Sequence, residues 1–180
     1  MAFTTQQFTQ SGVPIQSYNV DWVVGAGGVN PAVDVKLVQA LLRMAFYQLP
    51  PHPTLKPPAG ADIITVDGIA GPMTRKHIMA FQQAQKAHGL PTLVDGRMDP
   101  FRNQGELSHL AKVYYSLEKL NDYCFNMCKA NDVNWHQELT LQPYVKPHTD
   151  LVKSLTCGMR TVAKQYQYQA PQTVPSTGGA

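Results

Sequence analysis

One kind of turn occurs twice in this chain, and it limits the folds that the sequence can adopt. The segment ITVDGIAGPMTRKHIMAFQ, residues 64–82, carries Val-Asp-Gly followed by a proline, and LVDGRMDP, residues 93–100, repeats that order. An aspartate side chain accepts hydrogen bonds from nearby backbone amides, glycine tolerates a positive φ, and proline suits the first position of a helix. We therefore predict tight turns at 67–72 and 95–100.

Helical patterns lie on both sides of the first turn. Upstream we expect a helix with Asn30 as its N-cap, Pro31 at its first position and Asp34 near the positive end of its dipole. Downstream we expect a second helix that ends before Gly89. Apolar residues at helical spacing support both helices: Val35, Val38, Leu42 and Ala45 in the first, and Ile78 and Phe81 in the second.

The order of these elements resembles the peptidoglycan-binding-like domain family, whose members are small three-helix modules found beside many bacterial and phage cell-wall enzymes. The resemblance rests on a helix containing VQALL, the VDGIAGPMT turn, a helix ending in AFQ, and then GL and a second VDG. It covers about residues 24–100. The sequence departs from the family pattern at His77, where a small residue is usual, and from Asp99 onward, where the second repeat is degenerate.

The resemblance and the helical periodicity together predict a mainly α protein. We expect an N-terminal arm at 1–23, of which 1–17 is loosely held, and a small three-helix module at 24–104. A C-terminal helical extension at 105–168 and a flexible tail at 169–180 would follow. The proline-rich segment 47–62 should be an exposed loop. Two apolar stripes predict that the extension is a helical hairpin: Leu110, Val113, Leu117, Leu120, Cys124 and Met127, and Leu151, Leu155, Met159, Val162 and Tyr166.

Patterns for catalysis and for metal binding are weak. The six histidines are dispersed, without an HxH or HExxH motif. Cys157 has no adjacent histidine to ionise it, and Cys124 and Cys128 fit core packing better than metal ligation. The acids that a glycoside hydrolase would need are candidates by residue type alone: Glu106, Glu118 and Glu138. We expect no catalytic residue, no metal and no cofactor.

Charge and hydropathy bear on partners and location. The formal net charge is +3, and the basic residues are scattered rather than clustered, so we expect no nucleic-acid partner. No apolar run reaches the ~18–20 residues of a membrane span, and the first residues lack a standard signal peptide. We expect synthesis in the cytoplasm and delivery to the periplasm or cell envelope by another route.

The resemblance implies noncatalytic binding of bacterial cell-wall peptidoglycan, through its stem peptide or its glycan, as a targeting or accessory part of a phage or secretion system. Candidate ligand-binding residues lie at the two turns: Asp67, Gly68, Gly71, Thr74, Arg75, Gln82, Asp95, Gly96 and Arg97. The same residues would also serve simply to shape the turns. Two alternatives stay open, a protein-interaction scaffold or adaptor derived from the module, and a small cell-wall hydrolase or toxin.

Overall fold

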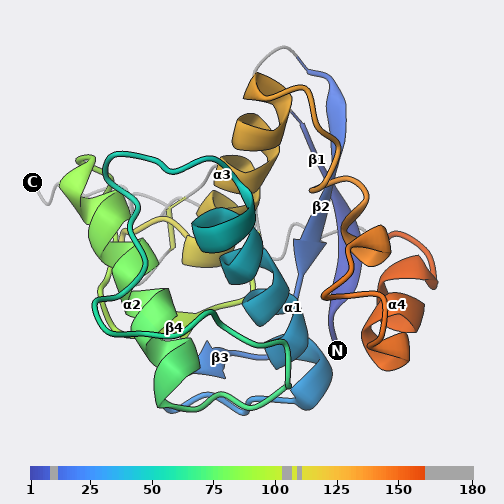
Figure 1. Cartoon of the computed structure of the whole chain (residues 1–180), viewed down its shortest axis with the longest axis horizontal. Coiled ribbons are helices and arrows are strands. Elements are labelled where there is room, and N and C mark those ends of the chain that lie inside the picture. The colour runs from blue at the N-terminus through green and yellow to red at the C-terminus, as the bar shows by residue number, and fades with distance from the viewer. Residues whose placement is uncertain (9–11, 103–106, 109–110, 161–180) are drawn as a thin grey trace, which may run out of the picture.

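The computed structural model describes residues 1–8, 12–102, 107–108 and 111–160 (Figure 1). The α helices of these residues are α1 (Ala32–Arg43), α2 (Pro72–Ala87), α3 (Ser116–Ala130) and α4 (Thr149–Thr156), with a π turn at Met44–Gln48 and a 3-10 turn at Leu139–Leu141. The strands are β1 (Phe3–Phe8), β2 (Pro14–Asn19), β3 (Val24–Gly25) and β4 (Arg97–Met98). The predictions of a mainly α protein and of a three-helix module at 24–104 are therefore wrong, because the described residues combine four α helices with two small antiparallel sheets, and β3 and β4 of the module form one of these sheets.

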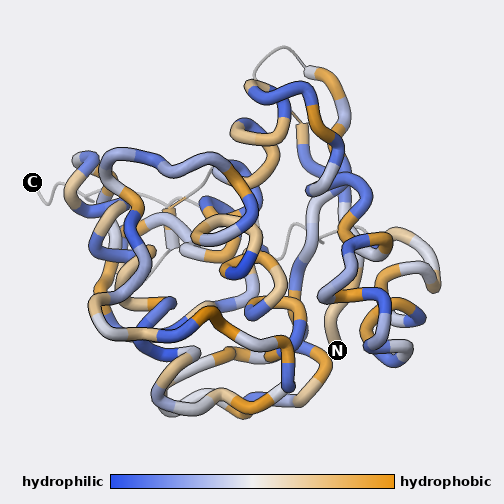
Figure 2. The backbone as a smooth tube through the Cα atoms, in the orientation of Figure 1, coloured by the Kyte–Doolittle hydropathy of each residue, from blue (hydrophilic) through white to orange (hydrophobic). Residues whose placement is uncertain are grey.

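The larger sheet is made from residues that we expected to form a loose arm. β1 pairs antiparallel with β2, from Phe3 opposite Asn19 to Phe8 opposite Pro14. Both strands are largely polar (Figure 2), so they lack the apolar alternation that predicts a strand. Several of their polar side chains are nevertheless buried: Thr4, Thr5, Gln7, Ser17 and Asn19.

Buried hydrogen bonds anchor this sheet to α3. Asn121 Oδ1 accepts from the Tyr18 amide, and Asn121 Nδ2 donates to the Tyr18 carbonyl, each at 2.9 Å. The Tyr18 hydroxyl donates to the His136 carbonyl at 2.7 Å, and His136 Nε2 lies 3.1 Å from Asn121 Oδ1. All three side chains are buried, so contacts that are distant in sequence give this polar strand the partners it needs.

The other strand of the sheet is held by α4. The Thr4 hydroxyl donates to the Leu155 carbonyl at 2.7 Å, and the Arg160 amide donates to the Thr4 carbonyl at 2.8 Å. The Ser154 hydroxyl also donates to the Ala2 carbonyl. The beginning and the end of the described chain are therefore bonded to each other.

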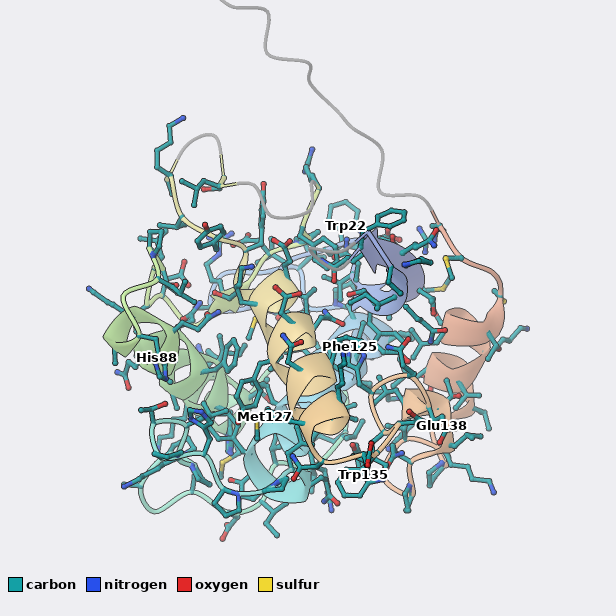
Figure 3. The ribbon with its side chains drawn as sticks, turned by 90° about the horizontal axis from the view of Figure 1, so that it is seen from above. Trp22, His88, Phe125, Met127, Trp135 and Glu138 are labelled. Carbon is teal, nitrogen blue, oxygen red and sulfur yellow. The ribbon has the colours of Figure 1, made fainter. Side chains whose placement is uncertain are left out.

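Helix α1 lies at the centre of the molecule and contacts α2, α3, α4 and β3. The predicted helical hairpin is wrong, because α3 and α4 each pack on α1 and stand apart from one another (Figures 1 and 3). Val113 precedes α3 and Met159 follows α4, whereas Leu110, Val162 and Tyr166 lie outside the described residues. The core residues of α1 explain its position: Val35, Leu37, Val38, Ala40, Leu41 and Leu42 are all inaccessible to solvent.

The two helices predicted around the first turn are confirmed, but Asn30 is not the N-cap of α1, because Pro31 occupies that position. Asn30 adopts a φ of 56°, and its side chain accepts from the Gly25 amide at 2.7 Å and donates to the Gly28 carbonyl at 2.8 Å. Asp34 lies in the first turn of α1, as predicted; it is buried, and its carboxylate accepts from the Trp22 amide at 3.1 Å. Both side chains thus hold the loop before α1.

The buried imidazole of His136 should make stability depend on pH. Burial lowers the pKa of His136 to about 3, whereas the value in an unfolded chain is about 6.5. Between these values the unfolded state binds a proton that the folded state does not, so stability falls as the pH falls. We expect His136→Gln to flatten this decline, which amounts to ~1.4 kcal/mol per pH unit.

Urea unfolding across a pH series, from neutral to about pH 4, measures this slope. The surface variant His88→Gln serves as the control and should keep the slope of the parent protein. An equal slope in the parent protein and in His136→Gln would contradict the burial of a neutral imidazole at this position.

Candidate functional site

A glutamine from α1 holds the first predicted turn. Gln39 Nε2 donates to Asp67 Oδ1 at 2.7 Å, and Gln39 Oε1 accepts from the Gly68 amide at 2.9 Å. Asp67 Oδ1 also accepts from the Ile69 amide at 2.8 Å, while Gly68 has a φ of 80°. The side chain that fixes this turn therefore lies 28 residues before it.

The second turn repeats this arrangement with a glutamine from α2. Gln82 Nε2 donates to Asp95 Oδ1 at 3.0 Å, and Gln82 Oε1 accepts from the Gly96 amide at 2.9 Å. Asp95 Oδ1 accepts from the Arg97 amide at 3.0 Å, and Gly96 has a φ of 72°. The prediction of two turns of one kind is confirmed. Each turn is held by a glutamine of its own, Gln39 of VQALL at the first turn and Gln82 of AFQ at the second.

The predicted ligand-binding residues fall into two clusters, one at each turn. Gly71 caps α2, and the Thr74 hydroxyl donates to the Ile69 carbonyl at 3.0 Å. Arg75 is exposed on α2, and Arg97 lies 3.5 Å from the Asp99 carboxylate. Most of these polar groups are already used in holding the turns: Asp67, Gly68, Thr74, Gln82, Asp95 and Gly96.

The residues considered for catalysis lie in different settings. Glu118 is buried, with Oε1 3.4 Å from Gln7 Nε2, whereas Glu138 and Cys157 are exposed and Glu106 lies outside the described residues. Burial raises the pKa of the Cys124 thiol, which contacts the Leu41 carbonyl. Packing in the core, as predicted, accounts for this cysteine.

A groove of about 260 Å³ lies between the proline-rich loop, the C-terminal half of α2 and α3. Its floor is apolar and contains Leu55, Phe81, Ala84 and Leu90. Polar side chains surround this floor: His52, Thr54 and His88, and then Gln85, Lys119, Asp122 and Tyr123. Figure 3 shows His88 at the end of α2. The loop at 47–62, which we predicted to be exposed, thus folds back and forms one wall of the groove. Its own residue Leu55 is buried.

Hydrogen bonds order the histidine wall. Thr54 Oγ1 lies 2.9 Å from His52 Nδ1 and is also bonded to His88 Nε2. The Thr54 amide also lies 3.4 Å from His52 Nδ1, so this threonine contacts both imidazoles. One threonine ties the loop to the end of α2.

Two polar atoms in the groove have no partner among the described residues. They are Gln85 Oε1 and the Tyr123 hydroxyl, and both are buried. Gln85 as a whole is only 6% exposed to solvent. Burial, with a smaller contribution from Cys124, raises the pKa of Tyr123 to about 12, so its phenol is neutral and can donate or accept. A concave apolar surface with a few convergent polar groups is typical of a ligand site.

Charge in the groove is largely balanced. Lys119 Nζ lies 2.9 Å from Asp122 Oδ2 and 4.7 Å from the centroid of the Tyr114 ring. Burial is the largest single effect and lowers the pKa of Lys119, but the hydrogen bond and charge of Asp122, with smaller contributions from Glu118 and Tyr114, together outweigh it, so this pKa lies above its ordinary value. Within the described part of the chain, no group of three or more His, Cys, Asp or Glu side chains is placed to hold a metal. No helix in that part combines the length and the hydropathy needed to cross a bilayer.

Comparisons with known proteins do not assign a family. No protein-family model matches the chain, and no curated protein and no solved structure matches it. The functional argument therefore depends on the residues and the geometry described above.

The bonds of Gln82 should have a measurable effect on stability. We expect Gln82→Leu to lower the free energy of unfolding by ~2–4 kcal/mol, because the Gly96 amide and the Asp95 carboxylate each lose a partner. Gln83→Leu is the matched control, since the neighbouring side chain is exposed and its loss should change stability by less than ~0.5 kcal/mol. Urea unfolding of the two variants measures the difference. Equal stabilities would mean that the turn does not depend on this carboxamide.

Proposed function

We propose that this protein binds bacterial cell-wall peptidoglycan without cleaving it, as a targeting or accessory part of a phage or secretion assembly. The resemblance to peptidoglycan-binding-like domains supports the proposal, because the residues that carry it form one interlocked unit of two helices and two turns. The groove gives the proposal further support. It lies where α2 of this unit meets the proline-rich loop and α3, and two of its lining residues, Gln85 and Tyr123, have buried polar atoms that lack a partner among the described residues.

The chemistry of the groove suits an N-acetylated sugar and the peptide joined to it. An acetyl methyl group fits the floor at Phe81, and an amide or sugar hydroxyl would donate to Gln85 Oε1. The neutral Tyr123 phenol would donate to an acetyl carbonyl. Aromatic and imidazole rings offer faces for a sugar ring, and Lys119 offers a charge-assisted bond to a stem-peptide carboxylate.

The noncatalytic part of the proposal follows from the acids of the groove. Among the described residues that line it, Asp122 is the single carboxylate, and it is paired with Lys119 at 2.9 Å. Glycoside hydrolysis by the usual mechanism needs two carboxyl groups on either side of the scissile bond. The groove thus has features for recognition rather than for hydrolysis.

Co-sedimentation with insoluble peptidoglycan sacculi tests the proposal. We expect the parent protein to enter the pellet and to release no soluble muropeptides. Tyr123→Phe and Gln85→Leu should each weaken retention about five- to tenfold, because each removes one hydrogen bond that the groove offers. The pair Arg75→Ala with Arg97→Ala, which changes the charges beside the two turns, should retain binding more fully than the groove variants.

Each contrary outcome favours a different hypothesis. Loss of binding in the arginine pair alone would place the ligand at the turns. A parent protein that stays in the supernatant at low salt would favour the scaffold or adaptor. Soluble muropeptides would favour the hydrolase, and Glu138 and Cys157 would then be the first described residues to replace.

A further inference from the structure

A second cleft, of about 460 Å³, lies where three parts of the chain meet. These parts are the end of α1 with the following π turn, the approach to the first turn, and the segment 143–148. Its polar lining residues are Arg43, Gln48, Thr65, Tyr144 and His148. None of them lines the groove described above, so this cleft is a separate site and does not depend on the proposed function.

Arg43 is the charged centre of the cleft, and most of its N–H groups have no hydrogen-bond partner among the described residues. Nη1 donates to the Ile64 carbonyl at 3.2 Å, and the guanidinium lies 5.2 Å from the centroid of the Tyr144 ring. Nε is buried and has no hydrogen-bond partner in the described part of the chain. These two contacts fix the orientation of the guanidinium, so its remaining N–H groups are already in place for an acceptor.

Tyr144 adds a second unused donor. Its hydroxyl is buried and lacks a partner among the described residues, and burial raises the pKa of this phenol, which stays protonated. The other polar lining side chains are an amide, a hydroxyl and an imidazole, all of which can donate. The described lining holds no carboxylate, so none of these side chains balances the charge of Arg43. A partly buried cation with unused donors is costly until an anion pairs with it.

We propose that this cleft binds a carboxylate ligand with an apolar body, such as the C-terminal residue of a peptide. The apolar part of the lining comes from Val66, Pro143, Pro147 and the Tyr144 ring. One guanidinium balances one carboxylate, whereas a phosphate dianion would keep an unbalanced charge against these apolar walls. The volume of the cleft also exceeds what a bare inorganic anion fills.

Titration followed by amide chemical shifts tests this proposal with defined probes. We expect N-acetyl-Ala-Ala to bind saturably, and its C-terminal amide, which lacks the negative charge, to bind at least about tenfold more weakly. Inorganic phosphate should bind more weakly than the acid. Arg43→Gln should weaken binding of the acid at least about tenfold and Tyr144→Phe about threefold to tenfold. Lys146→Gln, which removes a neighbouring exposed cation, should bind as the parent protein does.

Four results would overturn the proposal. These are equal binding of the acid and its amide, tighter binding of phosphate, unchanged binding in both cleft variants, and no saturable shift at millimolar acid. Because Arg43 also bonds to the Ile64 carbonyl, Arg43→Gln has a structural risk. Tyr144→Phe removes one hydroxyl, retains the ring beside the guanidinium, and keeps the test decisive if the arginine variant does not fold.

Discussion

The buried carboxamides of Gln39 and Gln82 are the interactions on which the centre of the molecule depends. Each donates to an aspartate and accepts from the following glycine amide, so one side chain fixes both ends of a sharp turn. The second turn also contacts the loop that precedes α1. The Ala26 amide donates to the Gly96 carbonyl at 3.0 Å, and a Cβ atom on Gly25 would lie 2.1 Å from that oxygen. Loop, turn and helix are therefore positioned together, and only glycine fits at position 25.

Local chemistry made part of this fold predictable. Glycine at a positive φ, proline at a helix start and apolar residues at helical spacing act within a few residues, and the two turns, α1 and α2 followed from them. The β1–β2 sheet could not be predicted in this way, because its polar residues are buried by partners such as Asn121, 103 positions from Tyr18. The apolar stripes of α3 and α4 showed that both helices are buried on one side, but not that both pack on α1.

The same distinction separates the predicted site from the observed clefts. The residues that carry the family resemblance are those that build the turns, and their hydrogen bonds are largely used within the protein. The groove and the Arg43 cleft are formed by segments that approach only in the folded chain, such as Thr54 with His88, 34 residues apart. Unused hydrogen-bonding capacity is a property of the folded structure, so no spacing in the sequence marks Gln85 or Tyr144.

The bonds between β1 and the region of α4 have a consequence for biosynthesis. The Thr4 hydroxyl finds its acceptor at Leu155, and the Thr4 carbonyl finds its donor at Arg160. During synthesis β1 can pair with β2 early, but its other edge lacks these bonds until residues 155–160 have left the ribosome. Closure of contacts over such long sequence separations slows folding, and an open strand edge is prone to association with other chains in the meantime. The open edge of the β1–β2 hairpin is therefore a surface that chaperones would protect during synthesis.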